Sequence, residues 1–239
     1  ELPPPSSEWA FEDTNIRELQ QDGLTGDDVR LCMVDTGISL THSALAGTTI
    51  EFKDFVGSEV SPVDYGSISH GTLMAGLLIS SGYQDGIAQG ITLGMAAALS
   101  ADGDENTGSE SRVASAIRWC IFDFEADIIS LSLGGEQNQE ASREGATVSA
   151  TRQALDLGIY VVAAAGNDGG SSDDGFVSAP GNVHLAITVG ASDRFNEVWS
   201  KSSAGEQVDS DGNLRQYPNQ KPELTAPGVS IAVSYTHLT

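Results

Sequence analysis

Short, continuously apolar runs recur along the chain and are separated by longer stretches in which polar and apolar residues mix. The runs occupy residues 30–34, 92–99, 128–133, 159–164, 185–190 and 229–233. Runs that do not alternate between polar and apolar positions are typical of strands covered on both faces. The pattern therefore predicts a buried sheet with parallel strands.

The stretches between the runs show helical spacing. Apolar residues from Val113 to Phe124 recur every three or four positions, and Ser109 or Ser111 is available as the N-cap. Further helices are predicted over residues 70–80 and 148–155. Alternating strands and helices of this length predict an α/β fold, a doubly wound parallel sheet with helices on both faces in a single domain.

Ligands of open α/β sheets bind beyond the carboxyl ends of the strands, so the residues that follow each run are candidates for a site. Asp35 follows the first run, Asn167 lies just past the fourth, and His70 opens a predicted helix. Each alone is ambiguous, because an Asp at a strand end is commonly a turn or cap residue. Together they suggest catalysis: a carboxylate can orient an imidazole as a base, and an amide can stabilise an oxyanion.

Six short segments resemble motifs of the subtilisin-like serine peptidases, the subtilases of peptidase family S8. They are VDTGI at 34–38, SHGT at 69–72, SLGG at 132–135, AAGN at 164–167, APG at 179–181 and APGV at 226–229. The order Asp before His is that of the subtilisins and not that of chymotrypsin or the α/β-hydrolases. The resemblance runs from about Asn15 to Ile231 and implies the subtilisin-like fold and serine endopeptidase chemistry.

The resemblance also implies a role for individual residues. Asp35 would orient His70, His70 would act as general base and then general acid, and Asn167 would stabilise the oxyanion. The implied substrate-binding residues line the two walls and the base of the first specificity pocket: Ser132, Leu133, Gly134, Ala165, Gly166 and Ser178. Because Ser178 is small and polar, we expect broad specificity.

The nucleophile of the family is missing from the printed sequence. Its Gly-Thr-Ser motif is expected about 20 residues past Pro227, which lies beyond Thr239. No Gly-Thr-Ser occurs in the 239 residues, and Ser230 and Ser234 lie in the wrong context. We therefore expect this chain to be inactive as it stands. The alternative is a non-catalytic homologue that binds peptides in the same cleft.

The chain divides into three parts on this basis. Residues 1–14, which include three consecutive prolines, are interpreted as a linker or processing junction. Residues 15–233 are interpreted as the peptidase domain without its C-terminal catalytic segment. Residues 234–239 do not resemble the family and are interpreted as a foreign tail.

The composition limits the classes of binding partner that we expect. Lys and Arg number 11 and Asp and Glu 34, so the net charge is −23, which disfavours nucleic acids and anionic membranes. A nucleotide-binding domain is disfavoured further because neither a GxGxxG nor a Walker motif is present. No apolar stretch approaches the length of a membrane span. We expect polypeptide substrates, a monomer, and an extracellular location, the last inferred from the resemblance and the acidic surface.

Two further expectations concern the state of the two cysteines and the binding of calcium. The favoured interpretation of Cys32 and Cys120 is two buried thiols, although a bridge between them cannot be read from the sequence. No metal site is assigned, and calcium remains open as a structural ion. The acidic loop at 209–213 lacks the distal Glu of a calcium loop, and Ala44 stands where the bacterial subtilisins have an acidic ligand.

Overall fold

The structure is a computed structural model. It describes residues 7–82, 85–135, 145–170, 176–205, 213 and 220–231. Residues 209–212 of the acidic loop and the tail at 234–239 therefore lie outside the described residues.

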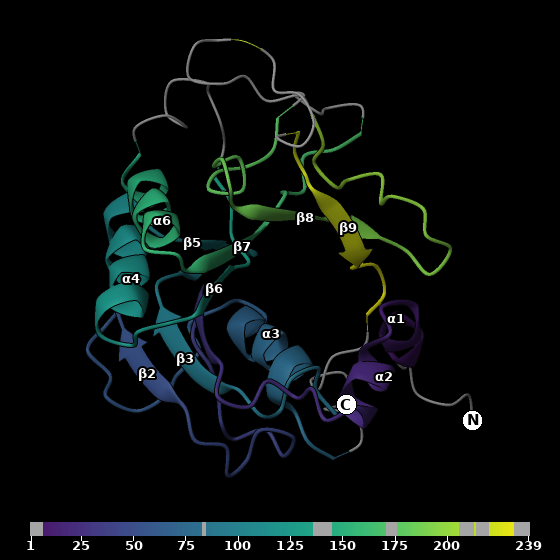
Figure 1. Ribbon diagram of the computed structural model, residues 1–239. Helices are drawn as coiled ribbons and strands as arrows, with labels where there is room; N and C mark the ends of the chain where they lie inside the picture. The colour runs from purple at the N-terminus through teal and green to yellow at the C-terminus, as the bar shows by residue number, and fades with distance from the viewer. Residues whose placement is uncertain are drawn as a thin grey trace.

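A seven-stranded sheet forms the centre of the molecule (Figure 1). Its order is β2-β3-β1-β6-β7-β8-β9, and every neighbouring pair is parallel. The strands are β1 (Arg30–Asp35), β2 (Glu51–Asp54), β3 (Thr92–Ala97), β6 (Ile128–Leu131), β7 (Tyr160–Ala164), β8 (Ile187–Ser192) and β9 (Leu224–Pro227). The predicted α/β class with a parallel sheet is confirmed.

Helices cover both faces of this sheet. On one face lies α3 (His70–Ile79), and on the other lie α4 (Glu110–Phe122) and α6 (Ala146–Asp156). Two short helices, α1 (Glu8–Asp13) and α2 (Ile16–Gln21), precede the first strand. Alternate residues of β1 point to opposite faces. Cys32 and Val34 belong to one apolar cluster with residues of α4 and α6, whereas Met33 belongs to another with residues of α3. The doubly wound arrangement is thus present, with α3 on the face opposite to α4 and α6 (Figure 1).

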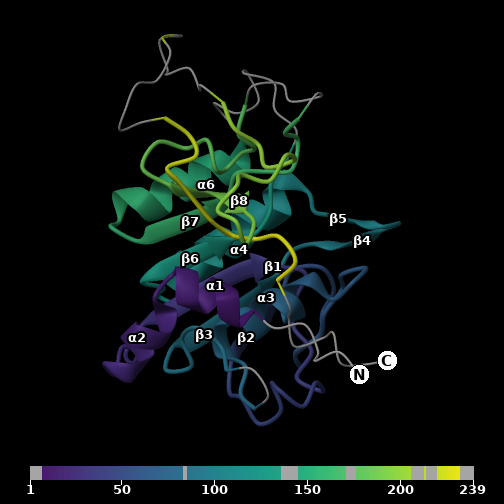
Figure 2. The same cartoon turned by 90° about the vertical axis from the view of Figure 1, so that its right-hand side faces the viewer.

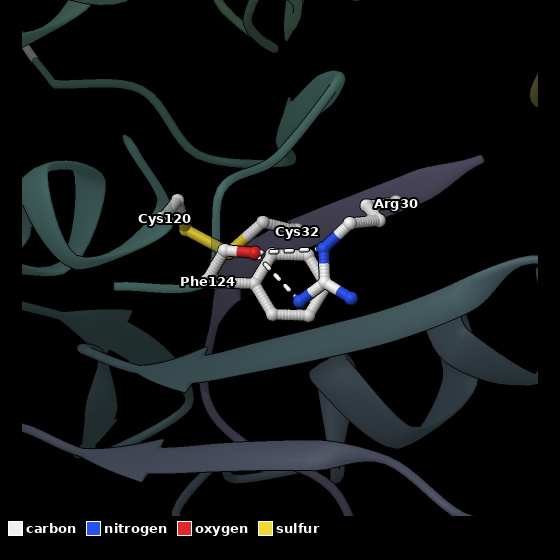
Figure 3. Close-up of a disulfide and its surroundings, with 4 residues drawn as sticks. All are labelled: Arg30, Cys32, Cys120 and Phe124. Carbon is white, nitrogen blue, oxygen red and sulfur yellow. Dashed lines mark hydrogen bonds between the residues drawn. A yellow bond between two sulfur atoms is a disulfide. The ribbon is translucent and has the colours of Figure 1, made fainter. Parts of the chain in front are cut away.

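A disulfide joins the first strand to one of these helices. Cys32 of β1 and Cys120 of α4 are bonded across a sequence separation of 88 residues, and both are fully buried (Figure 3). Beside the bridge, the Arg30 guanidinium donates to the Phe124 carbonyl oxygen from Nε at 2.8 Å and Nη2 at 2.6 Å. The favoured expectation of two free thiols was wrong, because the helical register of α4 brings Cys120 to the face that covers Cys32.

Several boundaries differ from those predicted. The run at 92–99 ends as a strand at Ala97, and the chain continues into a hairpin of β4 (Ser100–Asp102) and β5 (Glu105–Thr107). Figure 2 shows this hairpin projecting from the body of the molecule. The predicted strand at 229–233 is not observed in its described part, where Ser230 has a φ of 56°. The edge strand β9 ends at Pro227 instead.

The N-terminal segment also contains more structure than expected. Residues 8–13, which fall within the predicted linker, form α1. Phe11 of this helix is 4 % exposed, and the Arg17 guanidinium lies 4.3 Å from its ring centroid. This part of the segment is therefore helical, and the interpretation of residues 1–14 as a linker or processing junction stays a prediction.

Candidate active site

Asp35 is the last residue of β1 and is completely buried. Its backbone carbonyl accepts hydrogen bonds from the amides of Ala98 and Leu99 at 2.8 and 3.1 Å. Its side-chain Oδ1 accepts from the Thr36 amide at 2.7 Å. The carboxylate is thus held at the carboxyl edge of the sheet, where the topology predicts a site.

His70 begins α3 and reaches this carboxylate. The distance between His70 Nδ1 and Asp35 Oδ1 is 2.8 Å, and the imidazole remains 27 % exposed. With Nδ1–H donating to Asp35, the ring presents Nε2 as the basic nitrogen. The pair therefore has the orientation that a general base requires.

The electrostatic surroundings favour protonation of His70. The hydrogen bond to Asp35 raises the pKa of His70 above its ordinary value, burial opposes this shift, and the negative charges of Asp35 and Asp64 add to it. The carboxylates stabilise the imidazolium because opposite charges at short range favour the charged form. A general base that becomes an imidazolium during the reaction benefits from this stabilisation.

A loop before α3 supplies a site residue that the sequence analysis missed. Asp64 Oδ1 accepts from Thr36 Oγ1 at 2.7 Å, and its Oδ2 accepts from the Thr72 amide at 2.9 Å. Asp64 therefore connects the residue after Asp35 with the first turn of the His70 helix. A local signal existed in the Asp-Tyr-Gly turn just before His70, but nothing in the sequence identified which groups this carboxylate contacts.

The predicted specificity residues lie at the ends of two neighbouring strands. Ser132, Leu133 and Gly134 follow β6, while Ala165 and Gly166 follow β7. The Ala165 carbonyl accepts from the Ser178 amide at 2.8 Å. A Cβ added to Gly134 would meet Ser178 Cβ at 2.6 Å, and one added to Gly166 would meet Ser178 Oγ. The structure thus brings Ser178 against both strand ends.

Asn167 lies beyond Gly166 with an exposed side chain. Among the described residues, none forms a hydrogen bond with its side-chain amide. The neighbouring Asp168 is held by its backbone amide, which donates to Ser203 Oγ at 2.9 Å, and its Oδ2 lies 3.4 Å from Ser178 Oγ. A negative charge therefore lies beside Ser178, and the Asn167 amide has no competing bond within the described part of the chain.

The acid–base pair and the amide share one edge of the sheet. Strands β1, β6 and β7 are consecutive in the sheet order; Asp35 is the last residue of β1, and Asn167 lies three residues past the end of β7. Two strand spacings place the ends of β1 and β7 roughly 10 Å apart. His70 and Asn167 therefore belong to the same edge of the sheet.

Neither a candidate metal site nor a candidate membrane-spanning helix is found among the described residues. Across residues 7–82, 85–135, 145–170, 176–205, 213 and 220–231, no three His, Cys, Asp or Glu side chains group as a metal site. Within the same ranges, no helix has both the length and the apolar character needed to cross a membrane.

Known proteins are similar in sequence to most of this chain. The family model described as "Subtilase family" matches residues 26–239. Serine protease AprX of Bacillus subtilis (strain 168) is 34% identical over 236 residues, which cover 93% of this chain and 51% of AprX. A subtilisin of Bacillus pumilus is 32% identical over 213 residues, covering 89% of this chain and 69% of that protein.

A more distant relative and a solved structure agree with these matches. The extracellular serine proteinase of Thermus sp. (strain Rt41A) is 31% identical over 233 residues, covering 95% of this chain and 50% of that protein. The structure of the prenylagaramide maturation protease PagA superposes with a TM-score of 0.67 at 19% identity, covering 89% of this chain and 68% of PagA, and supports the fold alone. The chain spans about half the length of several of these curated relatives. Taken with the fold and the Asp35–His70 pair, the family match shows that this chain belongs to the subtilase family.

Proposed function

We propose that this chain is the part of a serine endopeptidase that carries its acid–base pair and its oxyanion donor. The observation that carries the proposal is the 2.8 Å contact between His70 Nδ1 and buried Asp35 Oδ1. This contact fixes the imidazole tautomer and leaves Nε2 as the base. The family relationship and the exposed Asn167 amide on the same sheet edge support the assignment.

In the proposed reaction, His70 Nε2 removes the proton from a serine hydroxyl as the oxygen attacks the scissile carbonyl carbon. The carbonyl π electrons move to oxygen, and the Asn167 side-chain amide donates to the resulting oxyanion. His70 then gives its proton to the leaving amine as the C–N bond breaks. Asp35 remains ionised throughout and stabilises the imidazolium. Water repeats the sequence to release the acyl group.

The proposed reaction needs a nucleophilic serine, which these residues do not supply in a Gly-Thr-Ser motif. The 239 residues contain no Gly-Thr-Ser, whereas Asp35, His70 and Asn167 are all present. A module that only bound peptides would have no chemical need for all three. This argument favours a peptidase over the alternative, a non-catalytic peptide-binding homologue.

The proposed substrate is an extended polypeptide. Residues 132–134 continue beyond the last ladder residue of β6, and Gly135 then forms a bridge with Ala179 through its amide at 3.2 Å. Backbone groups of Ser132 to Gly134 would pair with substrate in the manner of an added strand. Ser178 and the neighbouring Asp168 carboxylate would then contact the first substrate side chain.

The location and assembly are proposed as well. An extracellular site of action agrees with the Cys32–Cys120 disulfide, because such bonds persist in oxidising compartments. The extracellular relative from Thermus is consistent with this location. We also propose that the chain is a monomer and that calcium can serve as a structural ion.

The test begins with the coding sequence past Thr239. We expect a Gly-Thr-Ser motif within a couple of dozen codons, and the extended chain should react with a fluorophosphonate probe that esterifies activated serines. Replacing His70 by Ala should lower kcat by about 10⁶, the size of loss measured in a subtilisin. Asn167→Ala should lower kcat by about 10²–10³, again as in a subtilisin.

The 239-residue chain serves as the control and should not react with the probe. A continuation without the serine, or labelling that survives His70→Ala, would contradict the proposal. The first of these outcomes would favour the peptide-binding homologue instead.

A further inference from the structure

Asp64 accepts four hydrogen bonds from three different segments. At Oδ1 the donors are Thr36 Oγ1 at 2.7 Å and the Gly66 amide at 2.9 Å. At Oδ2 the donors are the Thr72 amide at 2.9 Å and Thr72 Oγ1 at 2.5 Å. Each oxygen of this half-buried carboxylate therefore accepts two hydrogen bonds.

The donors flank the two acid–base residues in the sequence. Thr36 directly follows Asp35, and Thr72 lies two residues after His70. Thr36 Oγ1 donates to Asp64 and also accepts from the Gly71 amide at 2.8 Å. The chain after Asp35 and the first turn of α3 are thus connected through one hydroxyl and one carboxylate.

Backbone contacts make this connection rigid. The Tyr65 amide donates to the Thr36 carbonyl at 2.8 Å, and the Ile38 amide donates to the Val63 carbonyl at 3.1 Å. A Cβ on Gly71 would collide with the carbonyl oxygen of Gly37. The three segments approach so closely that a shift in one must move the others.

We propose that Asp64 is a positioning residue that holds the His70 imidazole on Asp35 by fixing the two segments from which these side chains project. The catalytic meaning of this role rests on the proposed function, but the geometry of His70 does not. The negative charge of Asp64 has a second effect, because it favours the imidazolium together with Asp35. Within the described residues, two charged groups shift the pKa of His70: Asp35 at the end of β1 and Asp64 on the loop before α3.

The chain offers a matched control in Asp54. Its Oδ1 accepts from the amides of Val56 and Gly57 at 2.8 and 2.9 Å. Its Oδ2 accepts from the Glu59 amide at 2.8 Å and Tyr65 Oη at 2.7 Å. Asp54→Asn therefore removes one charge and disturbs four hydrogen bonds, as Asp64→Asn does, but Asp54 has no hydrogen bond to Thr36 or to the His70 helix and reaches the connection only through the phenol of Tyr65.

The experiment is an NMR titration of ¹⁵N-histidine in the 239-residue chain, with His70 assigned by comparison with His70→Gln. Asp64→Asn should lower the His70 pKa and should speed exchange of its Nδ1 proton roughly five- to tenfold, the effect of losing one or two net hydrogen bonds. Asp54→Asn should change neither property. Equal behaviour of the two variants would overturn the proposal.

A second variant separates position from charge and covers the case in which Asp64→Asn does not fold. Thr36→Val keeps the Asp64 charge but removes the hydroxyl that connects it to the Gly71 amide. Faster Nδ1 exchange in Thr36→Val, restored in Thr36→Ser, would support positioning. Unchanged exchange in Thr36→Val would overturn it and leave Asp64 with an effect of charge alone.

These readouts do not depend on hydrolysis. Failure of the fluorophosphonate test with a normal NMR result would reject the peptidase and keep the positioning role. The opposite combination would reject the role of Asp64 and keep the peptidase.

Discussion

The two halves of the candidate site are built differently. On one side, the buried Asp35 carboxylate, His70 and Asp64 are connected by hydrogen bonds of 2.5 to 2.9 Å. On the other side, the Asn167 side chain is exposed and has no hydrogen bond to another described residue. The first half is connected by hydrogen bonds within the described residues, whereas the second presents a donor with no partner in the described structure.

This difference matches the tasks proposed for the two halves. A base must have its tautomer and direction fixed beforehand, because its partner is part of the protein. An oxyanion donor must instead be available to an atom that appears only during the reaction. We therefore expect substitutions on the Asp35 side to affect stability, and substitutions at Asn167 to affect chemistry alone.

The largest effect on stability should come from the disulfide that anchors β1. Replacing both Cys32 and Cys120 by Ala should lower the free energy of unfolding by about 2–5 kcal/mol, because the unfolded chain regains the freedom of a long loop. Urea denaturation followed by tryptophan fluorescence measures this loss. Wild-type protein in a reducing agent should reproduce it, and unchanged midpoints in both samples would contradict the expectation.

A smaller but still large effect should come from the close approach of α3 to β1. Gly71→Ala places a Cβ against the Gly37 carbonyl oxygen, which belongs to the backbone and cannot rotate away. We expect a loss of about 3 kcal/mol. Gly135→Ala is the control on the opposite half, since no atom lies within 4 Å of its added Cβ. Similar unfolding midpoints for the two variants would contradict the comparison.

A smaller effect than the two substitutions above should be the dependence of stability on pH. We expect it to arise from the half of the site that contains Asp35 and His70. The pKa of His70 is raised above its ordinary 6.5, so the folded state binds more protons than the unfolded state just above pH 6.5. The stabilisation is complete below pH 6.5 and is lost as the pH rises through the folded pKa. His70→Gln should flatten the unfolding free energy over this window, while Asn167→Ala should retain the slope.

The smallest effect should be that of Asn167→Ala on stability. An exposed side chain without partners among the described residues contributes little to folding, and we expect a change within about 0.5 kcal/mol. Thermal unfolding at one pH is a sufficient measurement. A loss above about 1 kcal/mol would show that this half is also built into the folded framework.

Local patterns predicted much of the fold and part of the site. The runs that became β1, β6 and β7 were recognisable because buried parallel strands are continuously apolar. Their order placed Asp35 and Asn167 on one edge. Ser109 was one of two predicted caps, and its Oγ accepts from the Arg112 amide at 3.3 Å.

Features that depend on distant contacts were not predictable in the same way. The Cys32–Cys120 bond requires the register of α4 over β1, which no local pattern encodes. Asp64 is an ordinary loop acid until three segments converge on it. The run at 229–233 shows the reverse case in its described part, residues 229–231, because an apolar run cannot continue a sheet where Ser230 takes a left-handed conformation.

The span of the disulfide has a consequence for a chain that is exposed to peptidases. Cys32 and Cys120 close a covalent ring that contains both Asp35 and His70. Val60, which is 93% exposed, lies between them on an accessible loop. A single backbone cut at such a point would leave Asp35 on one fragment and His70 on the other, yet the two fragments would remain one covalent molecule. A cut within the ring therefore breaks the backbone but releases neither Asp35 nor His70 from the molecule.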